Sequence, residues 1–196
     1  LDVIRETEVQ GGMTVRLHTG DPSLYSTMRE QMCALERDGI PFRVTPGVSS
    51  FSAAAAAIPA EYTLPGVSQT LILTRAEGRT PVPETESITA LAAHGASMVL
   101  FLSAGMLPEI QKRLTEGAYD GETPAAIVYR ASWPDEEIFP CTVGTLAETG
   151  EKHGIRKTAL ILVGDFLNTP FERSCLYDPA FSTEYRPAVR EGESRE

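Results

Sequence analysis

Residues 15–28 read VRLHTGDPSLYSTM, and this stretch decides which fold the sequence predicts. Val15 and Leu17 alternate with polar residues, a pattern typical of a short strand with one apolar face. Gly20 permits an abrupt turn, or the close approach of a ligand, because it has no Cβ. In an open α/β sheet, a turn at the carboxyl end of a strand faces the ligand crevice. We therefore predict a binding turn here. A βα turn without a ligand is the alternative, which local chemistry alone favours.

A helix is predicted after this turn, over residues 23–38. Pro22 disfavours helical angles at the residue before it, so the helix can begin only after Pro22. Ser23 suits the N-cap position, and Asp21 lies near the positive end of the helix dipole. Apolar residues then follow one helical face, and Gly39 suits a left-handed C-cap.

The same order of elements recurs once. Residues 42–45 are predicted to form a second short strand, and PGVSS at 46–50 a second turn. Ser49 or Ser50 would cap the helix predicted over 52–58, where five consecutive alanines favour a helix and close packing. Proline and glycine at 59–66 then break regular structure. We place a boundary there, so that residues 1–66 are the remainder of an amino-terminal α/β domain.

A second series of strands and helices predicts a carboxy-terminal α/β domain over 67–179. The predicted strands are 69–74, 97–102, 123–129 and 158–163, with an antiparallel strand at 138–143. The predicted helices are 84–94, 108–116 and 146–153. We expect residues 1–12 to be a connector and 180–196 to be a polar, disordered tail.

Composition limits the classes of function. The 196 residues carry a formal net charge of −10, which argues against a nucleic-acid partner, because such partners need a basic surface. No apolar run approaches the roughly 20 residues of a membrane span. The three cysteines are far apart and suggest neither a disulfide framework nor a metal site. We therefore predict a reducing, cytoplasmic setting without a membrane partner.

Few residues point to chemistry by themselves. The sequence contains no phosphate-binding glycine motif and no His or Cys pair at metal spacing. His18 lies beside the predicted turn, where a half-buried structural histidine is the alternative to a catalytic one. Arg75 and Arg79 share a loop after one predicted strand, and Arg130 follows another. Guanidinium groups bind carboxylates bidentately, so converging arginines would suit a polycarboxylate ligand. Surface ion pairing with nearby glutamates is the alternative.

Motifs along nearly the whole chain resemble those of the tetrapyrrole methylase family. They are LHTGDPSLY (17–25), TPGVSSF (45–51), TLPGVSQT (63–70), LTRAEGRTPVP (73–83), VYRASWPDE (128–136), TALILVG (158–164) and LYDP (176–179). The first and sixth are shared across the wider family. The arginine loop and the block 128–136 are more specific to members that act on precorrin-4.

This resemblance implies an enzyme that methylates carbon 11 of precorrin-4 or cobalt-precorrin-4 with S-adenosylmethionine, in cobalamin biosynthesis. It also implies two α/β domains with the cofactor in the trough between them, and a homodimer. One alternative is a methylase of the same fold that acts on another tetrapyrrole carbon, as on uroporphyrinogen III. A methylase of ribosomal RNA is disfavoured by the acidic charge. A third alternative is an inactive fragment that serves only for binding or dimerisation.

The resemblance also implies cofactor contacts from both predicted domains. In the first domain these are Thr19, Gly20, Asp21, Leu24, Ser49 and Ser50; in the second they are Ala131 and Ser103, where relatives often have methionine. Arg75, Arg79 and Arg130 would face the tetrapyrrole. Methyl transfer from a sulfonium needs alignment and exclusion of water, and we expect no metal. The general base is unassigned, with His18 and Asp21 as weak candidates.

The sequence departs from the family at its beginning. The family opens with a strand and a loop of the Gly-Pro-Gly-Asp-Pro type, whereas this sequence starts at Leu1 without either. We therefore expect a fragment with an uncovered sheet edge in its first domain and with impaired activity.

Overall fold

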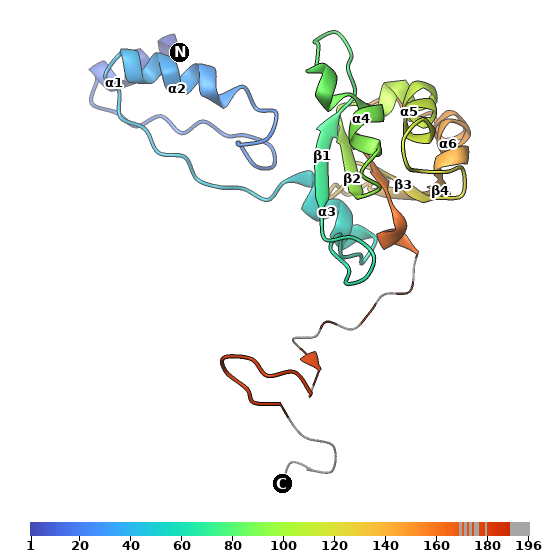
Figure 1. Cartoon of the computed structure of the whole chain (residues 1–196). Coiled ribbons are helices and arrows are strands. Elements are labelled where there is room, and N and C mark those ends of the chain that lie inside the picture. Colours follow the sequence, from blue (N-terminus) through green and yellow to red (C-terminus); the bar gives the residue numbers. More distant parts are fainter. Residues whose placement is uncertain (169, 171, 173, 175–176, 179, 189–196) are drawn as a thin grey trace. The chain divides into compact units, whose positions relative to one another are not determined.

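The computed structural model describes residues 1–168, 170, 172, 174, 177–178 and 180–188 (Figure 1). The chain divides into two compact units, Leu1–Ala54 and Ala55–Glu196. The predicted domain limits at residues 66 and 179 stay predictions, because a compact unit and a domain need not end at the same residue. The part of the predicted tail at 189–196 lies outside the described residues.

The first unit is helical. It holds α1 (Asp2–Val9), α2 (Met28–Arg37) and the start of α3 (Ser50–Ala57). The predicted connector at 1–12 is therefore wrong for most of its length. The Arg5 guanidinium bonds Asp38 at 2.7 Å, just after α2, and Asp2 at 2.9 Å, so α1 is tied to the end of α2 by charge.

The strands predicted at 15–18 and 42–45 do not form. A strand persists only where a neighbour supplies complementary N–H and C=O groups, and no segment of residues 1–54, all of which are described, does so. The alternation therefore buries no apolar face, and Val15 and Leu17 are 72% and 88% exposed.

The predicted helix over 23–38 begins five residues late, at Met28, with Thr27 as its N-cap. Ser23 is not the cap, because its N–H donates to the Asp21 carboxylate at 2.8 Å. Aspartate thus offers the backbone a local hydrogen bond that competes with helix formation. The predicted end is confirmed, since Gly39 has a φ of +69° directly after the helix.

The second unit contains a five-stranded mixed sheet in the order β1-β2-β5-β3-β4. Its strands are β1 (Leu71–Arg75), β2 (Ser97–Phe101), β3 (Pro124–Tyr129), β4 (Glu137–Thr142) and β5 (Ala159–Val163). β1 and β2 are parallel, whereas β5 is antiparallel to both β2 and β3. β4 is antiparallel to β3, as predicted. All five predicted strands are thus confirmed within one or two residues at each end.

Helices α4 (Ile88–Ala92), α5 (Leu107–Thr115) and α6 (Leu146–Lys152) lie together beside this sheet (Figure 1). Short 3-10 turns precede them at Glu84–Glu86, Ala104–Met106 and Val143–Thr145, and another follows β5 at Asp165–Leu167. Alternate residues of the central strands, such as Leu100, Ile127 and Ile161, form the main core with Ile110 and Leu146. Val99, Val128 and Leu162 face the other way and are buried too. A sheet buried on both faces explains the unbroken apolar runs.

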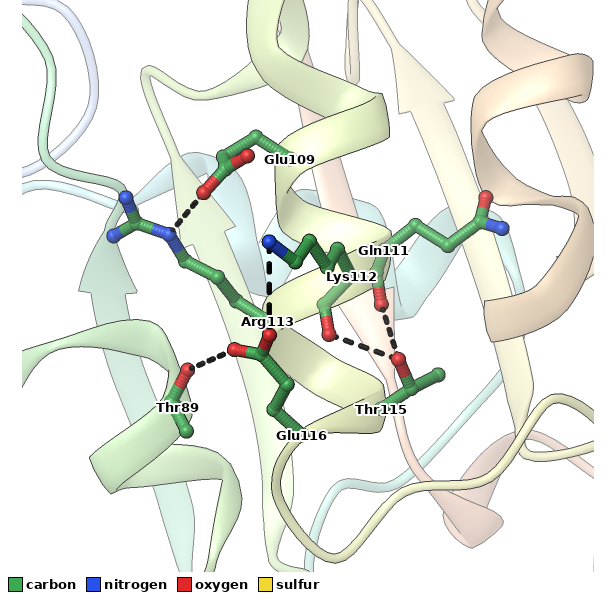
Figure 2. Close-up of polar contacts among 7 residues, drawn as sticks. All are labelled: Thr89, Glu109, Gln111, Lys112, Arg113, Thr115 and Glu116. Atoms are coloured by element: carbon green, nitrogen blue, oxygen red, sulfur yellow. Dashed lines mark hydrogen bonds and ion pairs between the residues drawn. The ribbon is translucent and has the colours of Figure 1, made fainter.

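Polar contacts on α5 join the helices at their surface (Figure 2). Arg113 pairs with Glu109 at 2.7 Å one turn away, which lowers the pKa of Glu109. Glu116 accepts a hydrogen bond from Thr89 of α4 at 3.3 Å. The Gln111 side chain reaches α6, where its oxygen accepts the N–H of Ala147 at 2.9 Å. α5 is therefore held to both neighbouring helices.

Candidate functional site

The two predicted chain reversals of the first unit meet. A Cβ built on Gly47 would lie 2.1 Å from the carbonyl oxygen of Gly20, so the two backbones touch where no side chain fits. Gly20 itself has a φ of +69°, a conformation that glycine adopts without strain. The Gly47 N–H donates to Asp21 Oδ2 at 2.9 Å. The structure thus joins the turn 19–22 to the turn 46–49 by backbone contact and by one carboxylate.

Asp21 is the centre of this junction. Its other oxygen accepts the Ser23 N–H at 2.8 Å and the Ser23 hydroxyl. Hydrogen bonds from the Ser23 hydroxyl, the Ser23 amide and the Gly47 amide lower the pKa of the Asp21 carboxyl. A carboxylate that is held by three donors is a poor proton acceptor, so the geometry favours a positioning role over that of a general base.

The remaining predicted residues of this unit surround the junction. Ser49 is 6% exposed, and its carbonyl accepts the Ser52 N–H at 3.0 Å at the start of α3. Ser50 is the first residue of α3 and is half-buried. Thr19 is exposed, and Leu24 is half-buried. His18 is half-buried beside the first turn, and its role as a base stays a prediction.

The predicted site residues of the second unit lie at one edge of its sheet. β1, β2 and β3 run in the same direction, since β1 is parallel to β2 and β5 is antiparallel to both β2 and β3. The loops that leave Arg75, Phe101 and Tyr129 therefore begin at the same edge. β1 and β3 are three strand spacings apart, or about 14 Å. Two arginine-bearing loops thus flank the end of β2.

The Arg75 side chain is hydrogen-bonded within its own loop. Its guanidinium donates to the carbonyl oxygens of Thr80 at 3.1 Å, Pro81 at 2.8 Å and Ala76 at 3.3 Å. These bonds fold the loop back on the end of β1. Arg79, near the tip of the same loop, is exposed. Arg79 is thus better placed than Arg75 to meet an anionic ligand.

Ser103 connects the ends of β1 and β2. Its side chain is fully buried, its hydroxyl donates to the Phe101 carbonyl at 2.6 Å, and it accepts the Ala76 N–H at 2.8 Å. The hydroxyl is therefore occupied within the protein. The predicted cofactor contact of Ser103 stays a prediction, and the same holds for the half-buried Ala131.

Arg130 lies close to two aromatic rings. Its guanidinium carbon is 4.9 Å from the centre of the Tyr129 ring and 5.3 Å from that of Trp133. One terminal nitrogen donates to the Asp135 carboxylate, and Nε is buried without a partner among the described residues. Sequence reasoning identified the arginine but not Trp133, although the neighbouring Arg and Trp were a possible signal.

Other parts of the described chain add little to this site. A cavity of about 340 Å³ between α5 and α6 is lined by residues such as Pro108 and Arg156, and by none of the predicted site residues. No group of three or more His, Cys, Asp or Glu side chains that could hold a metal ion occurs among the described residues. Within that same part of the chain, no helix is long and apolar enough to cross a bilayer.

Comparison with known proteins gives a consistent result. Residues 2–147 match the model of the family Tetrapyrrole (Corrin/Porphyrin) Methylases. The chain is 50% identical over 187 residues to a cobalt-precorrin-4 C(11)-methyltransferase of Methanocaldococcus jannaschii, a match that covers 95% of this chain and 72% of that protein.

Solved structures agree. A cobalamin biosynthetic enzyme, cobalt precorrin-4 methyltransferase, superposes with a TM-score of 0.83 at 46% identity, over 85% of this chain and 70% of that one. Uroporphyrin-III C-methyl transferase from Thermus thermophilus, complexed with S-adenyl homocysteine, gives a TM-score of 0.69 at 25% identity, over 84% of this chain and 71% of that one.

Proposed function

Because this chain belongs to the tetrapyrrole (corrin/porphyrin) methylases, we propose that it methylates carbon 11 of precorrin-4 or cobalt-precorrin-4 in cobalamin biosynthesis. S-adenosylmethionine is the methyl donor. The observation that carries this proposal is the 50% identity to a cobalt-precorrin-4 C(11)-methyltransferase over 95% of the chain.

The turns of the first unit suit the donor. Where Gly20 and Gly47 meet, a Cβ on Gly47 does not fit, so the chain at this junction is backbone and small side chains. Such a surface can offer amide and hydroxyl groups to a nucleoside and to an amino-acid moiety. We assign this role to Thr19, Gly20, Leu24, Ser49 and Ser50, with Asp21 holding the two turns together. Donor contacts at Ser103 and Ala131 are expected from the family resemblance alone, and Ser103 would contribute through its backbone, because its buried hydroxyl is occupied within the protein.

The sheet edge of the second unit suits the acceptor. Precorrins carry several carboxylate side chains, and an arginine binds a carboxylate through two parallel N–H donors. Arg79 is exposed for such a contact, Arg75 shapes the loop that carries it, and Arg130 lies on the loop that leaves β3 at the same edge of the sheet. These residues would fix the macrocycle so that its nucleophilic carbon lines up with the transferred methyl group, which is the main catalytic demand of this displacement.

S-adenosylmethionine supplies an electrophilic methyl on a sulfonium, and the chain's own groups align the reactants and exclude water. The acceptor carbon bonds to the methyl group as the S–CH₃ bond breaks, so the sulfonium becomes a neutral thioether and its positive charge passes to the conjugated acceptor. Loss of a proton from the acceptor then removes that charge, and His18 is the remaining candidate to accept this proton.

The test is a methylation assay with purified protein, S-adenosylmethionine carrying a ¹³C-methyl group, and precorrin-4 with or without cobalt. The proposal expects one added methyl group at carbon 11 by mass and NMR. Methylation only at another ring carbon, or only of uroporphyrinogen III, would replace the proposal with the alternative of the same fold. If the protein transferred no methyl group and released no heat on titration with S-adenosylhomocysteine, the inactive binding module would be favoured.

We further propose that the enzyme works as a homodimer in the cytoplasm, without a nucleic-acid or membrane partner. The homodimer rests on the family resemblance. The formal net charge of −10 supports only the lack of nucleic-acid and membrane partners, because it repels the phosphates of nucleic acids and anionic lipid surfaces. Sedimentation of the purified protein tests the oligomeric state.

A further inference from the structure

Trp133 is the most unusual exposed side chain of the second unit. Its surface is 53% exposed, although tryptophan is among the costliest side chains to leave in water. It is also the only tryptophan in the chain. It lies in the loop after β3, at the same sheet edge as the arginine loop after β1. A large aromatic surface at this edge of the sheet suggests a ligand that covers the indole.

The loop that carries Trp133 is rigid. The Trp133 N–H donates to the Arg130 carbonyl at 2.9 Å, and the Trp133 carbonyl accepts the Glu136 N–H at 3.1 Å. The Ser132 N–H donates to the Glu136 carboxylate at 2.6 Å. Arg130 itself is anchored, since its N–H donates to the Thr158 carbonyl at 2.9 Å. The backbone on both sides of the indole is therefore fixed before any ligand arrives.

The indole is also oriented from one side. The Arg130 guanidinium lies 5.3 Å from the centre of the Trp133 ring and is itself held by Asp135. A cation over an aromatic face fixes the plane of that ring. Because Arg130 is already engaged by Asp135 and two rings, its main contribution at this edge is to hold the indole. The rest of the ring surface stays open to solvent.

We propose that Trp133 is a stacking platform for the tetrapyrrole and helps to determine which acceptor is bound. This rests on the proposed function and adds to it a contact that neither the arginines nor the turns of the first unit provide. Conjugated pyrrole units are flat and apolar on their faces and anionic at their periphery. The indole would contact the flat face, while Arg79 meets the carboxylates.

A single fluorine-labelled tryptophan tests the contact directly. With 5-fluorotryptophan incorporated, the protein has one ¹⁹F resonance, from Trp133. The probe is uroporphyrin I, a stable planar tetrapyrrole with acetate and propionate side chains. The porphyrin absorption band reports binding, and the ring current of the bound porphyrin should shift the ¹⁹F resonance in step with that binding. S-adenosylhomocysteine alone should leave the resonance unshifted. A resonance that stays in place while the porphyrin binds, or a porphyrin that does not bind, would overturn the inference.

Kinetics of variants provide the second measurement. Trp133→Ala should raise the KM for the tetrapyrrole about tenfold, since aromatic stacking is commonly lost at that scale, and leave the KM for S-adenosylmethionine unchanged. Trp133→Phe should lie between Trp133→Ala and the parent. Tyr185→Ala is the matched control, because Tyr185 is a 91% exposed aromatic residue outside this edge.

The two proposals can fail separately. A protein that methylates precorrin-4 with an unchanged tetrapyrrole KM in Trp133→Ala keeps the proposed function and refutes the platform. A protein that transfers no methyl group, but whose ¹⁹F resonance moves with the porphyrin, refutes the proposed function and supports the platform.

Discussion

Removing one hydroxyl at Ser103 should loosen the sheet edge that carries the acceptor site. The Ser103 side chain is fully buried, and it bonds two backbone groups that belong to different strand ends. In Ser103→Ala the Ala76 N–H loses its acceptor at 2.8 Å and the Phe101 carbonyl loses a donor at 2.6 Å. Alanine is smaller than serine, so the change adds no steric conflict.

The magnitude follows from the buried amide. A buried polar group left without a partner costs about 1–3 kcal/mol, so we expect the free energy of unfolding to fall by about 2 kcal/mol. For a chain of this size, each kcal/mol lowers Tm by about 2–4 °C, which predicts a decrease of about 4–8 °C. Because Ala76 begins the arginine loop, the KM for the tetrapyrrole should rise as well.

Calorimetry or urea unfolding measures the effect, and Ser52→Ala serves as the control. Ser52 is exposed on α3, so its substitution should change stability by no more than about 0.5 kcal/mol. If Ser103→Ala unfolded together with the parent and the control, the hydroxyl would not be joining the two strand ends, and the account of this edge would be refuted.

Three further perturbations test other parts of the site. Asp21→Ala should weaken the binding of S-adenosylhomocysteine measured by calorimetry. Asp21→Asn should weaken it less, because the amide oxygen still accepts one N–H. Equal binding by the parent and both variants would remove Asp21 from the site. The pKa of Asp21 is lowered in the folded protein. The stability that the Asp21 carboxylate gives to the folded turns is therefore complete above the ordinary aspartate range, and it is lost only as pH falls through the lowered pKa. Binding in the parent should therefore weaken only at a pH below the ordinary aspartate range, as the Asp21 carboxylate becomes protonated, and Asp21→Asn should lack that component of the pH profile. Gly47→Ala should abolish cofactor binding, because its Cβ would lie 2.1 Å from the Gly20 oxygen. Thermal unfolding of the second unit should stay at the parent's temperature. Retained binding would show that the turns do not form the site. Arg75→Lys should raise the KM for the tetrapyrrole but not for S-adenosylmethionine, since a single ammonium cannot reach three carbonyls as the guanidinium fork does, and unchanged kinetics would contradict its positioning role.

The second unit was predictable from sequence because its strands are short apolar runs separated by strong breakers. Ser97–Phe101, for example, is buried on both faces as β2, so local composition and final environment agree. The strand at 15–18 failed for the opposite reason. Its alternation is correct for a strand, but pairing depends on a neighbour, which the local pattern cannot supply.

The positions of the turns in the candidate site were more predictable than the contacts of its side chains, and the ligand-binding roles of these residues stay predictions. A turn at Gly20 and a turn at 46–50 were both predicted, and the structure brings them together. Sequence alone could not show that Arg75 folds onto carbonyls five and six residues ahead, because that depends on the loop conformation. It also could not show that Trp133 stays exposed, because exposure is decided by the packing of distant segments.

The place of β5 in the sheet constrains how this protein can be made. β1 and β2 form one pair and β3 and β4 another, and β5, the last of the strands in the described residues, lies between the two pairs. On the ribosome, both halves must wait with unpaired edges until Val163 has emerged, since nothing earlier in the order can bridge them. Nascent chains stopped before Ala159 should therefore be substrates for chaperones and proteases, and cooperative folding should begin only when the final strand is released.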